Sequence, residues 1–204
     1  MTDKIYTEKN DLRAFFKAFR TSLSKEKKTR LDRRIAERFL TLPQYREAKT
    51  VLFYVSLPLE INTFSLMEQA FSDGKTVAAP RCVPGTREME FYILRSIHDL
   101  APGAFGVSEP KVESCEKLTD LSCGLCIVPA LGFARDGYRL GYGKGYYDRF
   151  LARFLGDTAG LVYDACLKDR LPHDKFDCKV KQIVTENQIL KIDSNQKKGG
   201  LPHA

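Results

Sequence analysis

Apolar and charged positions alternate with a helical period over the first forty residues. Residues 9–23 carry large apolar side chains on a single helical stripe: Leu12, Phe15, Phe16, Phe19 and Leu23. Lys17 and Arg20 fall outside this stripe, so the segment predicts an amphipathic helix. Ser24 can cap a second helix that ends before Pro43, along which apolar side chains recur at every fourth position: Leu31, Ile35 and Phe39. The chain is therefore expected to open with a helical pair.

The period then changes to that of strands. Residues 50–56 form a continuous β-branched and aromatic run that Pro58 halts, which predicts a buried strand. Thr63 can cap a following helix that stops at residues 73–74, an Asp-Gly pair, and residues 76–80 form the next short strand. Strand, helix and strand in this order predict a βαβ unit.

Three further strands complete the pattern. Residues 88–95 alternate as a half-buried strand does, and residues 125–129 and 160–164 are buried runs separated by a glycine-rich loop and a helix. Together these elements predict an α/β fold, a three-layer α/β/α sandwich with a mostly parallel central sheet. We expect one domain over residues 1–190, followed by a mobile tail at 191–204 that has no periodicity.

The net charge of the chain indicates which classes of ligand it could bind. The 204 residues carry a net charge of +7, which favours anionic ligands such as nucleic acid, a membrane surface, nucleotides or polyglutamylated folates. The basic residues are dispersed along the N-terminal helices, where solvated faces account for them, so no nucleic-acid partner is expected. No apolar run is long enough to span a membrane, and the N-terminus is charged, so we expect a cytoplasmic protein without a membrane partner.

The six cysteines are too few for a disulfide scaffold at this length. Cys123 and Cys126 form a C-x-x-C pair without a second pair at zinc-finger spacing. Reduced thiols in a core are therefore expected rather than a metal or redox site.

The segment richest in candidate chemistry covers residues 129–151. Glycine alternates at Gly141, Gly143 and Gly145 just before a helix, and Arg139 and Lys144 add positive charge. Glycines let the backbone approach a phosphate closely. The segment matches neither the P-loop nor the dinucleotide-binding pattern, so a strand-to-helix corner remains an equal alternative on this local pattern alone.

The run RLGYGKGYYDR at residues 139–149 resembles the signature of the 5-formyltetrahydrofolate cyclo-ligase (5,10-methenyltetrahydrofolate synthetase) family. Residues 9–13, 54–63 and 171–186 resemble three further elements of this family, in the same order. The resemblance covers nearly the whole chain, from Lys9 to about Glu186.

The resemblance implies an ATP- and Mg²⁺-dependent ligase of one-carbon metabolism. Such an enzyme converts 5-formyltetrahydrofolate to 5,10-methenyltetrahydrofolate with release of ADP and phosphate, through phosphorylation of the formyl oxygen and ring closure by N10. Lys144 and Arg139 are the implied catalytic residues. The implied ATP-binding residues are Lys9, Arg13, Arg139, Leu140, Gly141, Tyr142, Gly143, Lys144, Gly145, Tyr146 and Tyr147.

The resemblance also assigns the folate and the metal. Glu60 would accept hydrogen bonds from the pterin, and Val55 would line the same pocket. The glycine-rich loop would contribute further folate contacts: Tyr142, Gly143, Lys144, Gly145 and Tyr146. Asp148 and Asp177 would bind magnesium. No catalytic histidine is implied, and we expect a monomer.

Two other functions remain open at this point. Phosphosugar isomerases and coenzyme A transferases have similar three-layer folds and need no ATP, since fold does not fix function. A basic nucleic-acid-binding module is the second alternative, against which the absence of an aromatic and basic RNA motif argues.

Overall fold

Two consecutive helices open the chain, as predicted. The computed structural model describes residues 2–103 and 106–192. Helix α1 covers Thr2–Thr21 and α2 covers Lys25–Leu40, and a short α3 follows at Pro43–Glu47. The predicted cap is confirmed, because the Ser24 side chain accepts a hydrogen bond from the Lys27 amide. The apolar stripe of α2 is buried at Leu31, Ile35 and Phe39.

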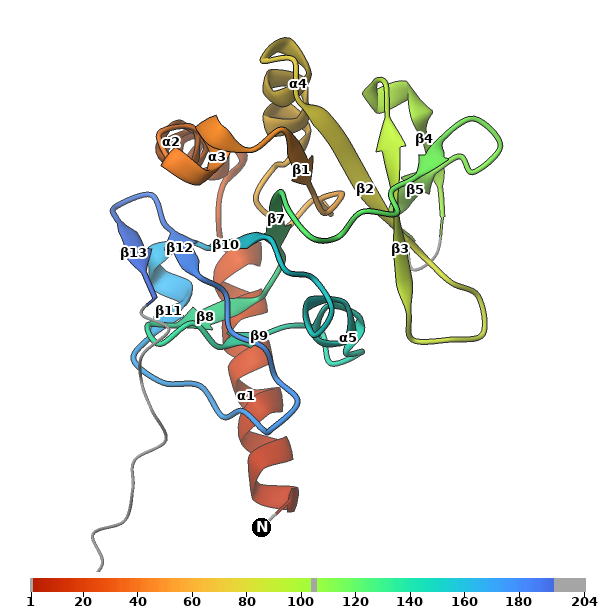
Figure 1. Cartoon of the computed structure of the whole chain (residues 1–204). Helices are drawn as coiled ribbons and strands as arrows, with labels where there is room; N and C mark the ends of the chain where they lie inside the picture. Colours follow the sequence, from red (N-terminus) through yellow and green to blue (C-terminus); the bar gives the residue numbers. More distant parts are fainter. Residues whose placement is uncertain (1, 104–105, 193–204) are drawn as a thin grey trace, which may run out of the picture.

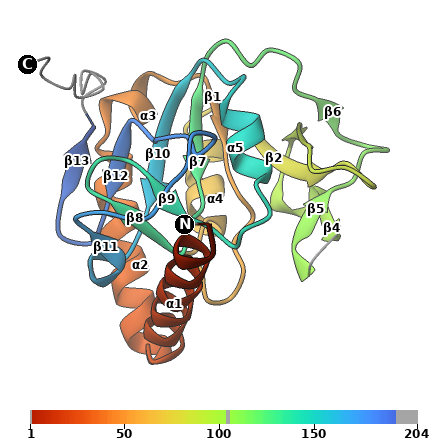
Figure 2. The same ribbon diagram turned by 90° about the horizontal axis from the view of Figure 1, so that it is seen from below.

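A mixed eight-stranded sheet forms the centre of the molecule (Figures 1 and 2), in the order β13-β12-β10-β7-β1-β2-β3-β6. The five strands from β12 to β2 are parallel to their neighbours, and β13, β3 and β6 are antiparallel edge strands. The strand bounds are β1 Thr50–Leu52, β2 Thr76–Cys82, β3 Met89–Leu94, β6 Glu116–Lys117, β7 Leu125–Val128, β10 Asp157–Leu161, β12 Gln182–Val184 and β13 Ile189–Lys191. The prediction of a mostly parallel sheet is confirmed for its centre.

The two faces of the sheet are covered differently. Helices α2, α3 and α4 (Phe64–Ser72) lie on one face, whereas α5 (Tyr146–Leu151) and a three-stranded sheet lie on the other (Figure 1). The small sheet has the order β11-β8-β9, with β8 at Gly132–Ala134, β9 at Arg139–Leu140 and β11 at Leu167–Lys168. The connection after β7 forms β8 and β9 before it reaches α5, so the second layer is less helical than the sequence predicted.

The remaining described elements are peripheral. A two-stranded hairpin joins β4 (Leu100–Pro102) to β5 (Ser108–Pro110). The short 3₁₀ helices η1 and η3 cover Ile97–Asp99 and Asp164–Cys166.

The predicted βαβ unit is present, with one local correction. Strands β1 and β2 are parallel and α4 connects them, and Gly74 ends the helix region with a φ of 71°. Thr63 stands at the helix N-cap, but its side chain makes no capping bond. Its hydroxyl donates to the Tyr54 carbonyl instead, and the Asn62 side chain accepts from the Phe64 amide. The cap prediction was wrong because a closer acceptor competes for the hydroxyl.

The buried apolar side chains of both faces belong to a single core cluster. All six cysteines are free thiols, but only Cys115, Cys126 and Cys166 are buried, whereas Cys123 is exposed. The C-x-x-C pair therefore spans a turn and a strand rather than lying wholly in the core. Residues 193–204, most of the predicted tail, lie outside the described residues.

Candidate active site

The order of the strands creates one favoured place for a ligand. Strands β1 and β7 are parallel neighbours, yet β1 connects through α4 to β2 on one side, and β7 connects through α5 to β10 on the other. The two connections cover opposite faces of the sheet (Figure 1). In open α/β sheets, such a reversal leaves a crevice at the carboxyl ends of the two strands, where ligands bind.

The loop after β1 brings a buried carboxylate to this edge. Glu60 is 6% exposed, and its Oε2 accepts a hydrogen bond from the Leu57 amide over 2.9 Å. Burial raises the pKa of Glu60, while the Leu57 amide, the Arg20 guanidinium and the Tyr142 hydroxyl act in the opposite direction. A buried carboxylate with so few partners can accept hydrogen bonds from a ligand.

Helix α2 holds this loop in place. The Asp32 carboxylate accepts from the Asn62 amide over 3.2 Å and from the Tyr163 hydroxyl over 2.6 Å, and Lys28 pairs with it one helical turn away. The Tyr54 hydroxyl donates to the Ile61 carbonyl across the same loop. The position of the loop is thus fixed from both sides.

The glycine-rich loop lies between β9 and α5. Gly143 and Gly145 have φ angles of 92° and 73°, in the left-handed region that glycine adopts without strain. Side chains of this loop reach neighbouring segments: the Tyr146 hydroxyl donates to the Thr86 carbonyl over 3.3 Å, and the Tyr142 phenol lies close enough to the Glu60 carboxylate to affect its pKa. Tyr142 is thus the side chain of the glycine-rich loop that lies near the loop after β1. Burial raises the pKa of Tyr142 to about 12, so its hydroxyl remains a donor at neutral pH.

Helix α1 packs its basic residues against the same edge. The Nε of Arg13 donates to the Gly141 carbonyl over 3.0 Å, and its Nη1 donates to the Asn10 side chain. Lys9 forms an ion pair with Asp177 at 3.1 Å. The Arg13 contact fastens α1 to the glycine-rich loop, and the Lys9 ion pair fastens the same helix to the segment around Asp177.

Asp148 is anchored by a buried arginine. Arg139 is 8% exposed, and its Nη2 donates to Asp148 Oδ1 over 2.6 Å while its Nη1 donates to the Cys178 carbonyl over 2.8 Å. The Cys178 amide also donates to Asp148 Oδ1. Since Asp177 directly precedes Cys178, the two predicted metal ligands belong to adjoining segments. No group of three or more metal-binding side chains occurs within residues 2–103 and 106–192.

A sequence model of the 5-formyltetrahydrofolate cyclo-ligase family matches residues 5–186. The chain belongs to this family. It is 28% identical to the 5-formyltetrahydrofolate cyclo-ligase of Mus musculus over 200 residues, which cover 90% of the chain and 96% of the mouse protein. It is 30% identical to a probable cyclo-ligase of Schizosaccharomyces pombe over 173 residues, 77% of the chain and 84% of that protein.

A solved structure agrees with the sequence match. The NMR structure of 5,10-methenyltetrahydrofolate synthetase from Aquifex aeolicus superimposes with a TM-score of 0.80 at 32% identity, and 96% of each chain is covered. As a cyclo-ligase family member, the chain is an enzyme of folate metabolism for which the family implies ATP. Among its described residues, no helix combines the length and apolar character needed to cross a membrane.

The structure brings most of the family-implied residues to one edge. Glu60, Tyr142, Arg13 and Lys9 are linked to it by the contacts above. Val55 lies in the same loop but is buried in the core, and Lys144 is exposed on the glycine-rich loop. Their roles in binding stay predictions.

The sequence pattern did not identify two side chains of this site, Arg20 and Asp32. Arg20 was placed outside the apolar stripe of α1, which suggested exposure, yet it is 3% exposed and lies beneath the site. Asp32 belongs to a charged helix, and the period of that helix gives no sign that its carboxylate holds the Glu60 loop. The signal available was the position of Asp32 beside the buried Leu31 and Ile35.

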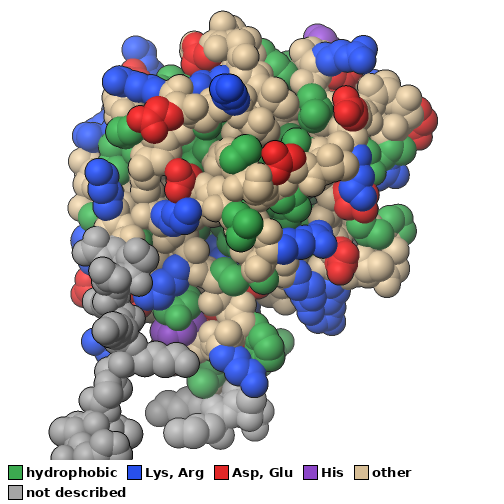
Figure 3. Space-filling view, in the orientation of Figure 1, with side chains coloured by type: hydrophobic (Ala, Val, Ile, Leu, Met, Phe, Trp, Pro, Cys, Tyr) green, Lys and Arg blue, Asp and Glu red, His purple; other side chains and the backbone are tan. Residues whose placement is uncertain are grey.

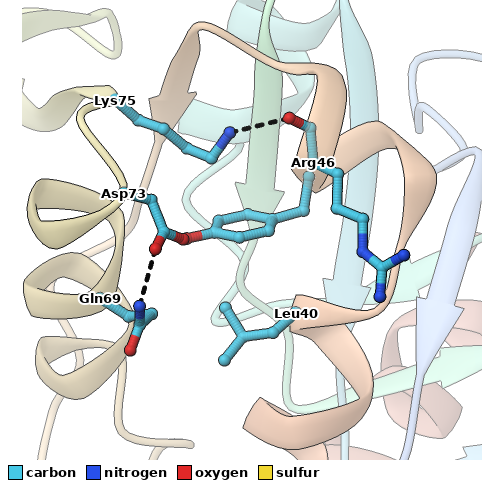
Figure 4. A pocket seen from close by; sticks show the side chains of 6 residues that line it. Leu40, Arg46, Gln69, Asp73 and Lys75 are labelled. Carbon is cyan, nitrogen blue, oxygen red and sulfur yellow. Dashed lines mark hydrogen bonds between the residues drawn. The ribbon is translucent and has the colours of Figure 1, made fainter.

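A surface depression of about 370 Å³ lies at the other edge of the sheet (Figure 4). Arg46 precedes β1 and Lys75 precedes β2, so this depression is near the amino ends of the parallel strands. Its polar groups bond to one another: the Tyr45 hydroxyl to Asp73 over 2.6 Å, Gln69 to Asp73 over 2.8 Å, and Lys75 to the Arg46 carbonyl over 3.1 Å. These hydrogen bonds hold α3 against the end of α4, so we assign the depression a structural role.

Proposed function

We propose that the carboxyl-edge site binds ATP and 5-formyltetrahydrofolate and forms 5,10-methenyltetrahydrofolate, ADP and phosphate. The observation that carries the proposal is the proximity of the Tyr142 phenol, in the glycine-rich loop, to the buried Glu60 carboxylate, in the loop after β1. It places a loop suited to phosphates beside a loop that ends in a buried carboxylate. Two substrates bound to these adjoining loops would have their reacting ends close together, which is the main requirement for phosphoryl transfer.

The reaction needs ATP because a formyl oxygen is a poor leaving group. Attack of this oxygen on the γ-phosphate forms a phosphate ester and releases ADP. N10 then attacks the formyl carbon, the N5–C–N10 ring closes, and phosphate leaves with the oxygen while N10 loses its proton. The protein contributes position and charge to this sequence rather than a nucleophile.

The phosphates would lie along the glycine-rich loop. Lys144 supplies a charge at the loop surface, and Arg13 and Lys9 supply charges from α1 next to it. Arg139 acts from below by holding Asp148 and the Cys178 carbonyl. The remaining loop residues from Leu140 to Tyr147 supply backbone and side-chain contacts to ATP.

The folate would lie against the loop after β1. The Glu60 carboxylate accepts hydrogen bonds from the pterin amino and ring N–H groups, and Val55 lies at the base of this loop. Tyr142 to Tyr146 would contact the folate from the ATP side, which places its formyl group toward the phosphates.

Asp148 and Asp177 fit a magnesium site of the kind completed by a nucleotide. Carboxylate oxygens are preferred ligands of Mg²⁺, and one or two of them suffice when phosphate oxygens and water fill the octahedral shell. The ion would neutralise charge on the transferring phosphoryl group. Arg139 and Lys9 already orient the two carboxylates in this structure.

The other two functions lack comparable support. The family match favours an ATP-dependent ligase over a phosphosugar isomerase or coenzyme A transferase. On the face shown in Figure 3, Lys and Arg side chains are interspersed with Asp and Glu instead of forming one continuous patch. A nucleic-acid interface needs such a patch. We also propose a monomer with a single domain over residues 1–190, located in the cytoplasm.

An isotope experiment tests the proposed chemistry. The substrate is labelled with ¹⁸O in its formyl group and converted with unlabelled ATP in unlabelled water. Transfer of the label into inorganic phosphate is expected, since the formyl oxygen leaves with phosphorus. Unlabelled phosphate together with labelled water would contradict phosphorylation of the formyl oxygen.

A further inference from the structure

Arg20 places a fixed positive charge at the base of the proposed site. It lies one residue before the end of α1 and is 3% exposed. Its Nη2 donates to the carbonyl oxygens of Ala130 over 2.5 Å and of Leu131 over 2.9 Å. Both carbonyls lie within three residues of the end of β7, one of the two strands at which the connections reverse. The guanidinium is therefore anchored where the fold favours a ligand.

Among the described residues, the other two nitrogens of this guanidinium have no hydrogen-bond acceptor, although the group lies 6.0 Å from the centroid of the Tyr163 ring and near the Cys166 thiol. Nε and Nη1 of Arg20 are buried, and within the described part of the chain no group accepts a hydrogen bond from either. Leaving a buried charged donor unpaired is costly, and native proteins almost always satisfy such groups. An acceptor from outside the chain is the expected partner.

Within the described residues, neither nearby carboxylate accepts a hydrogen bond from Arg20. Asp32 accepts from Tyr163, Asn62 and Lys28, so its oxygens are directed elsewhere. Glu60 accepts from the Leu57 amide, and the Tyr142 phenol lies nearby. The Arg20 guanidinium lowers the pKa of both Glu60 and Tyr142, which shows that it lies within electrostatic reach of them.

The chemistry of the pterin matches this pair of side chains. Its amide edge presents N–H donors directly beside a carbonyl acceptor. Glu60 can bind only the donors, because a carboxylate accepts hydrogen bonds, whereas a guanidinium can bind only the carbonyl. The two side chains together would recognise both halves of the edge.

We propose that Arg20 is a folate-binding residue that donates a hydrogen bond to the pterin carbonyl oxygen, beside the N–H groups bound by Glu60. The proposal rests on the folate site proposed above. Tyr142 is 46% exposed and stands between Gly141 and Gly143 in the glycine-rich loop. The pterin replaces the Tyr142 hydroxyl at Glu60 and so reaches Arg20.

Calorimetric binding of two ligands tests the proposal. One ligand is 5-formyltetrahydrofolate, and the other is its 4-amino-4-deoxy analogue, in which an amino group replaces the carbonyl. The full chain is compared with Arg20→Met, which keeps an unbranched apolar stem without the guanidinium donors, and with Glu60→Gln. Arg33→Met is the matched control, because Arg33 is 80% exposed on α2 and pairs only with Glu37 among the described residues.

Arg20→Met is expected to weaken binding of 5-formyltetrahydrofolate by about ten- to a hundredfold, the loss of a hydrogen bond from a charged donor. Binding of the 4-amino analogue should change less than threefold, and Arg33→Met should bind both ligands as the unmodified chain does. Comparing two ligands on one variant cancels any general loosening of the α1 to β7 contact. If Arg20→Met does not fold, Arg20→Lys keeps the charge and is expected to show a smaller loss for the carbonyl ligand alone.

Two results would overturn the proposal separately from the proposed function. If Glu60→Gln weakens folate binding but the Arg20 variants do not, Arg20 only holds α1 on β7, and water satisfies its nitrogens. An equal loss for both ligands in the Arg20 variants would likewise make it structural. If neither Glu60→Gln nor the Arg20 variants change binding, the folate site itself is misplaced.

Discussion

Arg13 and Gly141 lie 128 positions apart in the sequence, yet the Arg13 Nε donates to the Gly141 carbonyl over 3.0 Å. This bond fastens the first helix to the glycine-rich loop. Because of this bond, the N-terminal helix is part of the proposed nucleotide site.

Two substitutions of Arg13 distinguish the effect of its charge from the effect of its hydrogen bond. Arg13→Met should raise KM for ATP by about tenfold, the loss of about 1.4 kcal/mol. Arg13→Lys should recover part of this, because it keeps the charge but lacks the fixed donor geometry of the guanidinium. Steady-state kinetics with each substrate in turn provide the check. A larger change in KM for folate than for ATP would place Arg13 at the other substrate.

The two glycines beside Tyr142 offer a matched pair of substitutions. At Gly143 φ is 92°, and an added Cβ would come within 3.0 Å of the Arg13 Nη2, whereas a Cβ at Gly141 would meet nothing within 4 Å. Gly143→Ala should therefore strain the loop by about 1 kcal/mol or more and raise KM for ATP. Gly141→Ala should leave it within about twofold. Equal behaviour of the two variants would show that the loop adapts freely.

Substitutions of Lys144 and Arg139 should differ in their effect on protein stability, although both residues are proposed to support ATP use. Lys144 is exposed, so Lys144→Ala should lower kcat/KM for ATP without changing the melting temperature. Arg139 bonds to Asp148 and to the Cys178 carbonyl. Arg139→Ala should cost about 1.5–3 kcal/mol and lower the melting temperature by about 3–12 °C as well. Thermal unfolding measured beside ATP kinetics distinguishes them, and wild-type kcat/KM for ATP in both would make the loop a structural corner.

Arg20 and Arg139 show what the sequence could and could not reveal. The period of the N-terminal residues predicted α1, and alternating glycines marked the loop, because both signals are local. The burial of Arg20 depends on carbonyls at Ala130 and Leu131, and the clamp at Arg139 depends on Cys178. Such long-range partners leave no trace in helical or strand periodicity.

The same limit explains the differences in the sheet. Strands β1 and β7 lie in largely apolar runs, which is how buried parallel strands are recognised. Strand β10 begins at Asp157, three residues before the predicted strand at 160–164. The prediction missed this start because the first two residues of the strand are polar and do not extend the apolar run. The edge strand β6 has only two residues, both exposed, and it pairs with β3 across a long loop. Its sequence carries no hydrophobic pattern, so it could not be predicted.

The metal site gives a prediction that depends on magnesium. Asp148→Asn and Asp177→Asn keep side-chain size but remove a charge that binds the ion. Each variant should fold, lose most of its activity and require more Mg²⁺ to recover part of it. Titration of activity with Mg²⁺ at saturating ATP measures this shift. Wild-type Mg²⁺ dependence in either variant would make that carboxylate structural.

Glu60 gives a pH dependence whose sign follows from its burial. Burial raises the pKa of Glu60, so protonation begins at a higher pH than for an exposed glutamate. Only the ionised carboxylate accepts both pterin N–H groups, so KM for folate should rise as the pH falls through the raised pKa. Glu60→Gln should raise KM at neutral pH and flatten this profile. A profile that is unchanged in Glu60→Gln would remove Glu60 from the site.

Formation of the methenyl product tests the central claim most directly. The purified chain is mixed with 5-formyltetrahydrofolate, ATP and Mg²⁺, and the near-ultraviolet absorbance of 5,10-methenyltetrahydrofolate is followed beside ADP release. One ADP per methenyl product is expected, with no product when ATP is omitted. Absence of the absorbance at high enzyme concentration, or product formation without ATP, would contradict the account.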